Sequence, residues 1–463
     1  SSDVCSSDLG PFQLMNVTGV PIAFHAATSL GEAIHPFYAP AETLRQQVEV
    51  EGVDWNLEGN PDPSVFTAVN DRLLGVVAHV AAELVDEGVA SVEDCDIGAR
   101  VGLRWARGPF QMVNEAGVEA CAELARQALA TYGLAPPALL QSPGPAGIPI
   151  RLVSVGKRRG LASVKVERPD AMNALNPEVL GQLAAGLEEA RQSGRGIAVS
   201  GSGKAFIAGA DIKFFVDHLR AETVPEILNF TRDGQAFFAS LSGGKEAVVA
   251  RVHGLSLGGG SELALACDWI AASPKASFGF PETGIGIYPG LGGTQRLPRR
   301  VGLPLAKWLV YTGQSVGAEQ ALEIGLCDAV ASFEDLDRAC EVLVGRGPSG
   351  ERSAPTAAPA EGWEGLWEFF TENGVDAILS GEACPGSDPA LEKAVKRMRA
   401  KSANALFQAE RLFDEGAGLG LEEALALELR DLDEVFAHPD ALEGLSALIE
   451  GRRPGFKETA KAP

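Results

Sequence analysis

The stretch HGLSLGGGSELALACD, residues 253–268, places three consecutive glycines directly before an apolar segment with the composition of a helix. Glycine lets a backbone approach a ligand closely, and the first amide N–H groups of a helix have no partners within that helix. These groups also lie at the positive end of the helix dipole. The segment therefore predicts backbone donors that can hold an oxyanion.

A second glycine-bearing segment, KAFIAGADIK at residues 204–213, offers the same close backbone approach. Glu262 falls in the first turn after the triple glycine, and Glu282 follows twenty residues later within FGFPETGIG. Two carboxylates can divide acid and base work on one substrate if they converge in space, which spacing alone does not establish. The structural alternative is a glycine-rich helix start with Glu262 as a charge partner of the dipole.

Short apolar runs alternate with helical stretches around these segments, for example LASVKV (161–166) and EAVVARVHG (246–254). This alternation predicts an α/β domain. A stretch rich in Gly, Pro, Ala and Ser at 345–362 precedes a mostly helical tail. Apolar residues recur there at helical spacing: Leu421, Ala424, Leu425, Leu432, Val435 and Phe436. The aromatic cluster of Trp363, Trp367, Phe369 and Phe370 favours a core or docking surface over a ligand platform.

The first third of the chain carries an internal repeat. GPFQLMNVTGV (10–20) and GPFQMVNEAGV (108–118) share seven of eleven positions at an offset of 98 residues, which indicates two related helical units. Between them an amphipathic helix closed by Gly88 is expected, with His79 as a structural histidine. Its apolar stripe comprises Leu73, Val76, Val77, Val80, Ala81 and Leu84. APPALLQSPGPAGIP, residues 135–149, is interpreted as an interdomain linker.

Residues 1–9, SSDVCSSDL, have no periodicity that leads into the next segment. The last eight match the translation of a sequencing adapter, so we set this stretch apart from the fold as an artefact. A natural disordered N-terminus is the alternative. The artefact interpretation implies that the chain is a piece of a longer protein.

Length and composition limit the function further. A chain of 463 residues fits about three domains, and a net charge of −23 argues against nucleic-acid or anionic-membrane surfaces. No apolar run approaches a membrane span and no secretory signal is recognisable, so we expect a cytoplasmic protein. The seven cysteines and six histidines have no metal-ligand spacing, which predicts free thiols and no metal site.

Residues 150–335 resemble the enoyl-CoA hydratase/isomerase (crotonase) superfamily, in the order and at the spacings of its motifs. The motifs are RPDAMNAL (168–175), AFIAGADIK, HGLSLGGGSELALACD, FGFPETGIGIYPGLGGTQRLPR (278–299) and the terminal EGLSALIEGRRPGFK (443–457). The resemblance implies an α/β crotonase core built as a ββα superhelix. Residues 336–463 would then form an insertion and the helical C-terminal region.

The same resemblance implies a mechanism. The N–H groups of Ala210 and Gly259 would polarise a thioester carbonyl, while Glu262 activates water and Glu282 donates a proton to C2. Such donors suit the enolate charge that develops when water adds to an enoyl thioester in fatty-acid β-oxidation. Presence of both glutamates favours a hydratase, with an isomerase of the same fold or a non-catalytic acyl-CoA-binding protein as alternatives.

For the CoA portion of the substrate we expect contacts from the loop around Ala208 and Asp211 and from Lys204 and Lys213. The family's basic position in RPDAMNAL is here Asp170, a departure that affects the phosphate site. Hydration requires no cofactor beyond the CoA thioester itself. The resemblance also implies a homo-oligomer, with a crotonase-type trimer as one form.

Residues 10–134 resemble the all-α C-terminal region of 3-hydroxyacyl-CoA dehydrogenases in its duplicated form. GPFQLMNVTGV, VNDRLL and DEGVASVEDCDIGAR (86–100) carry the likeness. Such dehydrogenases begin with a nucleotide-binding domain bearing G-x-G-x-x-G, and no such motif precedes residue 10. We therefore expect part of a multifunctional dehydrogenase/hydratase without its NAD site, and no dehydrogenase activity.

Overall fold

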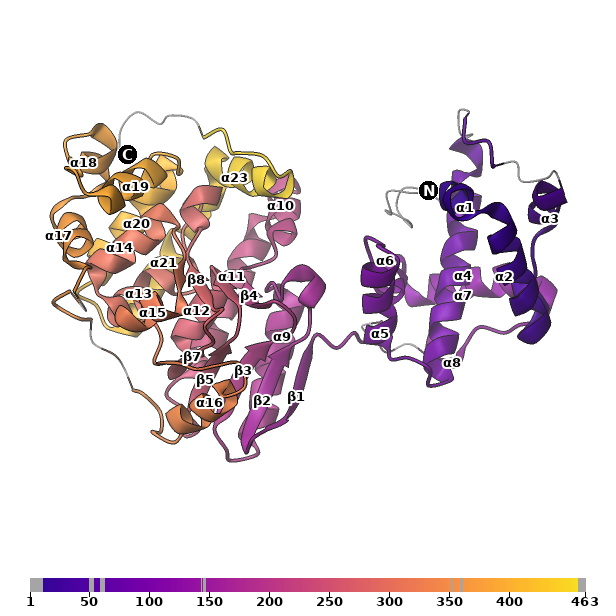
Figure 1. Ribbon diagram of the computed structural model, residues 1–463, viewed down its shortest axis with the longest axis horizontal. Coiled ribbons are helices and arrows are strands. Elements are labelled where there is room, and N and C mark those ends of the chain that lie inside the picture. Colours follow the sequence, from indigo (N-terminus) through magenta and orange to yellow (C-terminus); the bar gives the residue numbers. More distant parts are fainter. Residues whose placement is uncertain are drawn as a thin grey trace. The chain divides into compact units, whose positions relative to one another are not determined.

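Figure 1 shows the computed structural model, which describes residues 11–49, 54–58, 63–142, 144, 147–350, 352, 354–358 and 361–456. The stretch set apart at residues 1–9 lies outside the described residues. The chain divides into two compact units, Ser1–Arg151 and Leu152–Pro463, and each is described by itself.

The first unit is mainly helical in its described residues, with an isolated bridge between Gly144 and Gly147 near its end. Its α-helices are α1 (Pro11–Thr18), α2 (Val20–Ala33), α3 (Glu42–Glu49), α4 (Phe66–Asp86), α5 (Val92–Ile97), α6 (Pro109–Ala116), α7 (Val118–Leu129) and α8 (Ala138–Gln141). The sequence repeat becomes a structural repeat, since α1 and α2 correspond to α6 and α7. A glycine with positive φ joins each pair, Gly19 at 103° and Gly117 at 91°.

Helix α4 is the central helix of this unit and packs most extensively against α7. The helix was predicted, but its buried face is turned by one position from the predicted stripe, since Leu73 and Leu84 are exposed. The buried residues are Leu74, Gly75, Ala78, His79, Ala81 and Ala82. Small residues line this face because α7 lies very close: a Cβ on Gly75 would stand 2.6 Å from the carbonyl oxygen of Leu124.

By length and composition the stretch Pro63–Asp86, which contains α4, is also the one described helix apolar enough to cross a membrane. Within this helix, 33% of the most apolar 18-residue segment is buried inside the unit. His79 on the same helix is 2% exposed, packs beside the Phe37 ring and lies 3.7 Å from a carboxylate oxygen of Glu83. These contacts are those of a core residue.

Residues 135–149 differ from the linker that their composition suggested. They contain α8, and Leu140 and Ile148 are buried in the core of the first unit. The side-chain amide of Asn114 donates to the carbonyl of Ile148 and accepts from its N–H, both at 2.8 Å. This paired contact fixes a segment that periodicity could not identify, and the division between the units falls after Arg151.

The second unit contains two sheets. The six-stranded sheet has the order β1 (Val153–Arg158), β2 (Leu161–Val166), β3 (Ile197–Gly201), β5 (Val248–Val252), β7 (Trp269–Ala272), β10 (Ala329–Val330). The four-stranded sheet has the order β4 (Ala205–Ala208), β6 (Leu255–Leu257), β8 (Ser277–Gly279), β9 (Val316–Gly317). All neighbours are parallel except β1 with β2 and β8 with β9.

From β3 to β8 consecutive strands enter alternate sheets, so that β3, β5 and β7 lie in the larger sheet and β4, β6 and β8 in the smaller one. This is the predicted α/β domain, with turns of two strands and intervening helices (Figure 1). Its helices are α9 (Pro177–Arg191), α10 (Ile212–Arg220), α11 (Val224–Leu241), α12 (Gly259–Ala266), α13 (Gly293–Val301), α14 (Leu303–Thr312), α15 (Ala318–Glu323) and α16 (Leu336–Val344).

The C-terminal region is helical, as predicted. Its helices are α17 (Glu364–Glu372), α18 (Val375–Ser380), α19 (Pro389–Met398), α20 (Ala403–Gly416), α21 (Leu421–Arg430), α22 (Leu432–Ala437) and α23 (Pro439–Ile449). Helices α17 and α19 pack on α14. The aromatic cluster serves as core here, since Trp363, Phe369 and Phe370 are buried and the Trp363 ring lies 5.5 Å from that of Trp308 on α14.

Candidate active site

Three loops meet at one edge of the smaller sheet. Residues 209–211 follow β4, Gly258 and Gly259 follow β6, and Glu282 lies three residues after β8. Because β4, β6 and β8 are adjacent and parallel, their carboxyl ends lie at the same edge. The register of the sheet therefore brings together motifs that are more than seventy residues apart in the sequence.

The N–H groups of Ala210 and Gly259 lie side by side. A Cβ built on Gly259 would stand 3.7 Å from the amide nitrogen of Ala210. A bridge to Leu175 uses the carbonyl of Gly209 and the amide of Asp211, which leaves the intervening Ala210 N–H outside the bridge. Among the described residues neither the Ala210 nor the Gly259 N–H has an acceptor, so both are available to a ligand.

The triple glycine is required by close contacts on two sides. A Cβ on Gly260 would stand 1.9 Å from the carbonyl oxygen of Ile207, so only glycine lets α12 approach β4. Gly258 has a φ of 49°, and its Cβ would stand 2.4 Å from the carboxylate of Glu282. These glycines seat the start of α12 against the loop and the carboxylate.

Glu262 and Glu282 converge on one cavity of about 330 Å³, which Ala210 and Gly259 also line. Most of the remaining lining is apolar: Ile212, Phe215, Phe230, Leu257, Ile285, Ile287, Leu291, Leu432, Phe436 and Leu448. The cavity thus combines two carboxylates and two free backbone donors with a largely apolar lining. This arrangement suits a thioester with an acyl chain.

The two carboxylates have different surroundings. Oε1 of Glu262 accepts hydrogen bonds from the amides of Leu291 and Gly293, both at 2.8 Å, whereas Oε2 of Glu282 is buried without a hydrogen-bond partner among the described residues. Burial raises the pKa of Glu282 to about 8. Burial, and then the charges of Glu282 and Glu428, raise the pKa of Glu262. The pair is therefore arranged to retain a proton near neutral pH.

The residues expected to bind CoA are only partly brought together. Ala208 lines the cavity, but Lys204 and Lys213 are exposed and do not line it. Lys204 precedes β4 and so lies about 13 Å, one strand length, from the loop that follows β4. Asp211 caps α10 through the amide of Lys213 at 3.2 Å and pairs with Arg168 at 2.8 Å.

Sequence reasoning missed two residues. Arg168, in RPDAMNAL, is a basic group held at the first loop by side-chain contacts, to Asp211 and to the carbonyl of Ala174 at 3.1 Å. Glu428 on α21 is fully buried and belongs to the same polar cluster as Glu262. Its signal was present in the sequence: Glu428 continues the apolar helical spacing from Ala424 to Leu432, where a charged residue is unexpected.

Metal and disulfide chemistry find no support in the described part of the chain. No group of three or more His, Cys, Asp or Glu side chains is placed there to hold a metal ion. The cysteines described, Cys95, Cys121, Cys267, Cys327, Cys340 and Cys384, are all free thiols. None of these cysteines lines the cavity described above.

Comparison with known proteins identifies two families along the chain. Residues 156–344 match enoyl-CoA hydratase/isomerase, and residues 69–147 match the C-terminal domain of 3-hydroxyacyl-CoA dehydrogenase. Both resemblances predicted from the sequence are confirmed, as is the order of a helical region followed by a crotonase fold with C-terminal helices.

Individual relatives agree with this division. A crotonyl-CoA hydratase from Syntrophomonas wolfei is 37% identical over 230 residues, 49% of this chain and 85% of the relative. A short-chain-enoyl-CoA hydratase from Clostridium acetobutylicum is 40% identical over 187 residues, 40% of this chain and 70% of the relative. The crystal structure of an enoyl-CoA hydratase from Rhodobacter sphaeroides matches with a TM-score of 0.57 and 25% identity, over 66% of this chain and 93% of that one.

Proposed function

The chain belongs to the enoyl-CoA hydratase/isomerase family, and from that premise we propose that it adds water across the 2,3 double bond of a trans-2-enoyl-CoA to give a 3-hydroxyacyl-CoA. The observation that carries the proposal is the meeting of two buried carboxylates and two free backbone donors around one cavity. A family member that only bound acyl-CoA would need the donors but not both carboxylates.

The backbone donors act on the thioester carbonyl. Addition of water at C3 moves electron density onto this oxygen, so an enolate-like charge develops in the transition state. The Ala210 and Gly259 N–H groups are fixed before substrate arrives, and Gly259 also begins α12. One such preorganised donor commonly contributes about 3 kcal/mol to transition-state stabilisation.

The carboxylates act on the water and its proton. We assign Glu262 as the base, because two amide N–H groups on its Oε1 favour the ionised form. Burial raises the pKa of both carboxyl groups, so the pair holds a proton at neutral pH, and we assign this proton to Glu282 because its Oε2 has no donor among the described residues. The hydroxyl of the water bonds to C3, its proton passes to Glu262, and the proton of Glu282 passes to C2.

The direct test follows the loss of the conjugated-thioester absorbance when the purified chain is mixed with crotonyl-CoA. Hydration with 3-hydroxybutyryl-CoA as product supports the proposal. Incubation with a 3-enoyl-CoA separates the alternatives, because an isomerase converts it to the 2-enoyl isomer. Rapid isomerisation without hydration would assign the cavity to the isomerase branch of the family.

For the helical unit we propose a packing role in a multifunctional protein rather than hydride transfer. Residues 69–147 match only the C-terminal domain of the dehydrogenase family, and dinucleotides are ordinarily held by a strand, a glycine turn and a helix. We also propose that the chain assembles with copies of itself, which light scattering would measure. Titration with NADH and an acetoacetyl-CoA reduction assay test the packing role of the helical unit. Micromolar NADH binding or measurable turnover would overturn it.

A further inference from the structure

The turn formed by residues 291–294 lies between two buried carboxylates. Its amides alternate: Leu291 and Gly293 donate to Glu262, as described, whereas Gly292 donates to Oε1 of Glu428 at 2.6 Å and Thr294 to Oε2 at 3.2 Å. The Thr294 hydroxyl also donates to Oε2 of Glu428. The donors that fix the candidate base and the donors that fix Glu428 therefore belong to one four-residue segment.

Glu428 is surrounded by donors that favour its ionised form, while burial raises its pKa to about 7, so the carboxylate is mostly charged only above that pH. Besides the turn, the side-chain amide of Gln235 on α11 donates to its Oε1 at 2.8 Å and also donates to the carbonyl of Gly290 at 2.9 Å. Every described partner of the carboxylate is a donor, and a charged carboxylate accepts up to four hydrogen bonds. The turn is at the start of α13, whose N-terminal amides have no partners within the helix.

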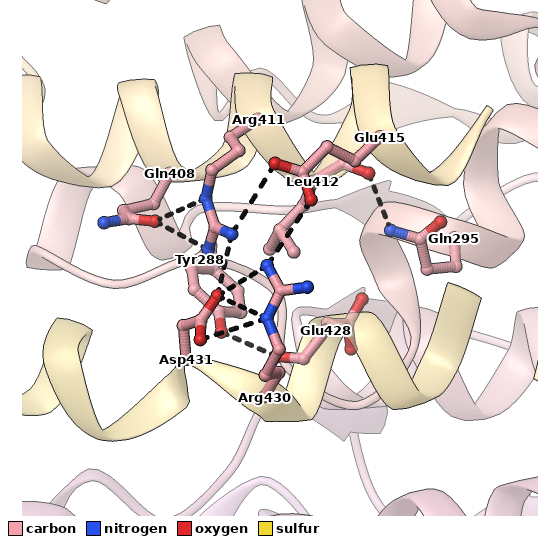
Figure 2. A network of polar contacts seen from close by, with 9 residues as sticks. All are labelled: Tyr288, Gln295, Gln408, Arg411, Leu412, Glu415, Glu428, Arg430 and Asp431. Carbon is pink, nitrogen blue, oxygen red and sulfur yellow. Dashed lines mark hydrogen bonds and ion pairs between the residues drawn. The ribbon is translucent and has the colours of Figure 1, made fainter. Parts of the chain in front are cut away.

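The helix that carries Glu428 is itself fixed. Figure 2 shows the Tyr288 hydroxyl donating to the backbone carbonyl of Glu428, at 2.7 Å. In the same view Arg411 of α20 binds Asp431 at 2.7 Å, and Arg430 binds the same carboxylate. These contacts hold the end of α21, so the Glu428 side chain is presented to the turn from a rigid element.

From this geometry we propose that Glu428 is a positioning residue for hydration: it holds the 291–294 turn so that two amides fix Glu262, and its negative charge helps the Glu262–Glu282 pair to keep its proton. Glu428 is absent from the cavity lining, so it acts through the turn and through its field. This inference rests on the hydratase function proposed above.

The charge effect has a definite sign. The charge of Glu428 raises the pKa of both Glu262 and Glu282, after burial as the largest cause. Other groups act on this cluster, and all of them remain in the variants below. They are Arg296 on α13, Tyr288 in the preceding loop, Arg411 on α20, Asp431 and Asp433 at the start of α22, and Lys401, whose charge lowers the pKa of Glu282. Removal of the Glu428 charge should therefore move both pKa values down.

The test is Glu428→Gln in the full chain, with Glu423→Gln as the matched control, since Glu423 is exposed on the same helix. For Glu428→Gln we expect kcat to fall about 10- to 100-fold with KM changed little, because a misplaced Glu262 impairs chemistry more than binding. The alkaline limb of the kcat/KM pH profile, where Glu428 is charged, should move to lower pH by roughly half to one unit. Glu423→Gln should retain the parental kcat and both limbs.

A folded Glu428→Gln protein with parental kcat, or with reduced kcat and an unmoved alkaline limb, would overturn the proposal. If Glu428→Gln does not fold by circular dichroism, Thr294→Val decides. It removes a donor that lowers the pKa of Glu428, so Glu428 carries less charge. We expect a smaller loss of kcat, with the alkaline limb displaced in the same direction. An unaltered Thr294→Val enzyme would then reject the role. Parental protein without hydration of crotonyl-CoA would instead refute the function proposed above.

Discussion

The two copies of the repeated segment have nearly the same backbone and very different surroundings. In both, a helix, a positive-φ glycine and a second helix follow one another, and an asparagine clamps a backbone segment downstream: Asn16 binds Trp55 and Asn114 binds Ile148, each through one donor and one acceptor. Yet Phe12 in the first copy is 51% exposed and Phe110 in the second is fully buried.

The difference shows what a repeated sequence specifies. The shared glycine and asparagine determine the local conformation, which is equal in both copies. Burial instead depends on a neighbour, because α6 and α7 have α4 to pack against. The second unit, Leu152–Pro463, resembles the second copy of the repeat in this respect, since its motif residues lie against strands and helices from distant parts of the chain.

The largest expected effect is the loss of stability when a buried residue of the repeat is truncated. Phe110→Ala should destabilise the helical unit by about 3–5 kcal/mol, because it leaves a cavity beside α4. Phe12→Ala, at the equivalent position, should change stability by less than about 1 kcal/mol. Urea-dependent hydrogen exchange of peptides from residues 66–129 in the full chain measures both, and equal effects would show that the two copies are packed alike.

In the second unit the equivalent test of a buried residue is the loss of a buried carboxylate. Glu262→Gln and Glu282→Gln should each reduce kcat for crotonyl-CoA by about 10²-fold or more, since each removes a positioned acid or base. Binding of the substrate should change less than kcat. Unchanged turnover in both variants would reject the two-carboxylate mechanism, and circular dichroism serves as the control for folding.

The asparagine clamps sharpen the comparison between copies. Asn114→Ala should cost about 1–2 kcal/mol, because the N–H and carbonyl of buried Ile148 lose their partners. Asn16→Ala should have a smaller effect, because Trp55 is only partly buried and can bind water. The same exchange experiment applies, and a larger effect at Asn16 would contradict this explanation.

The pH profile tests how the two glutamates differ. Glu282 must hold a proton to act as an acid, and burial raises its pKa to about 8. Activity should therefore persist below pH 8 and fall as pH rises through it, by about tenfold for each further unit. A kcat/KM profile that stays flat from pH 7 to 10 would assign the acid role to another group.

The smallest effect concerns the exposed lysines. Lys213 begins α10 beside the first loop, whereas Lys204 lies at the opposite end of β4. Lys213→Glu should weaken acyl-CoA binding by roughly three- to tenfold at low salt and reduce its salt dependence. Lys204→Glu should leave binding unchanged. Identical affinities for both variants at low and high salt would remove Lys213 from the CoA site.

Local patterns in the sequence were sufficient for much of this fold. Strand and helix alternation predicted the α/β unit, and the glycine segments with Glu262 and Glu282 predicted residues that the sheet register places around one cavity. The buried face of α4 was off by one position because apolarity favoured Leu73 and Leu84, whereas close packing with α7 required small residues.

The remaining features depend on partners distant in sequence. Ile148 is held by an asparagine 34 positions away, and Glu428 by a turn 134 positions or more before it. Composition alone identified neither contact. The position of Lys204 was also not evident from the sequence, since proximity in sequence does not reveal that a strand separates a residue from a loop.

The glycine contacts limit how this protein can evolve. At Gly258 and Gly260 every amino-acid replacement adds a Cβ that would overlap the Glu282 carboxylate or the Ile207 carbonyl, so a replacement must displace the carboxylate or the start of α12. Leu432, Phe436 and Leu448 in the C-terminal helices also line the cavity, and they are not part of these glycine contacts. Natural selection can therefore alter the choice of acyl group through the tail while the reaction chemistry is inherited unchanged.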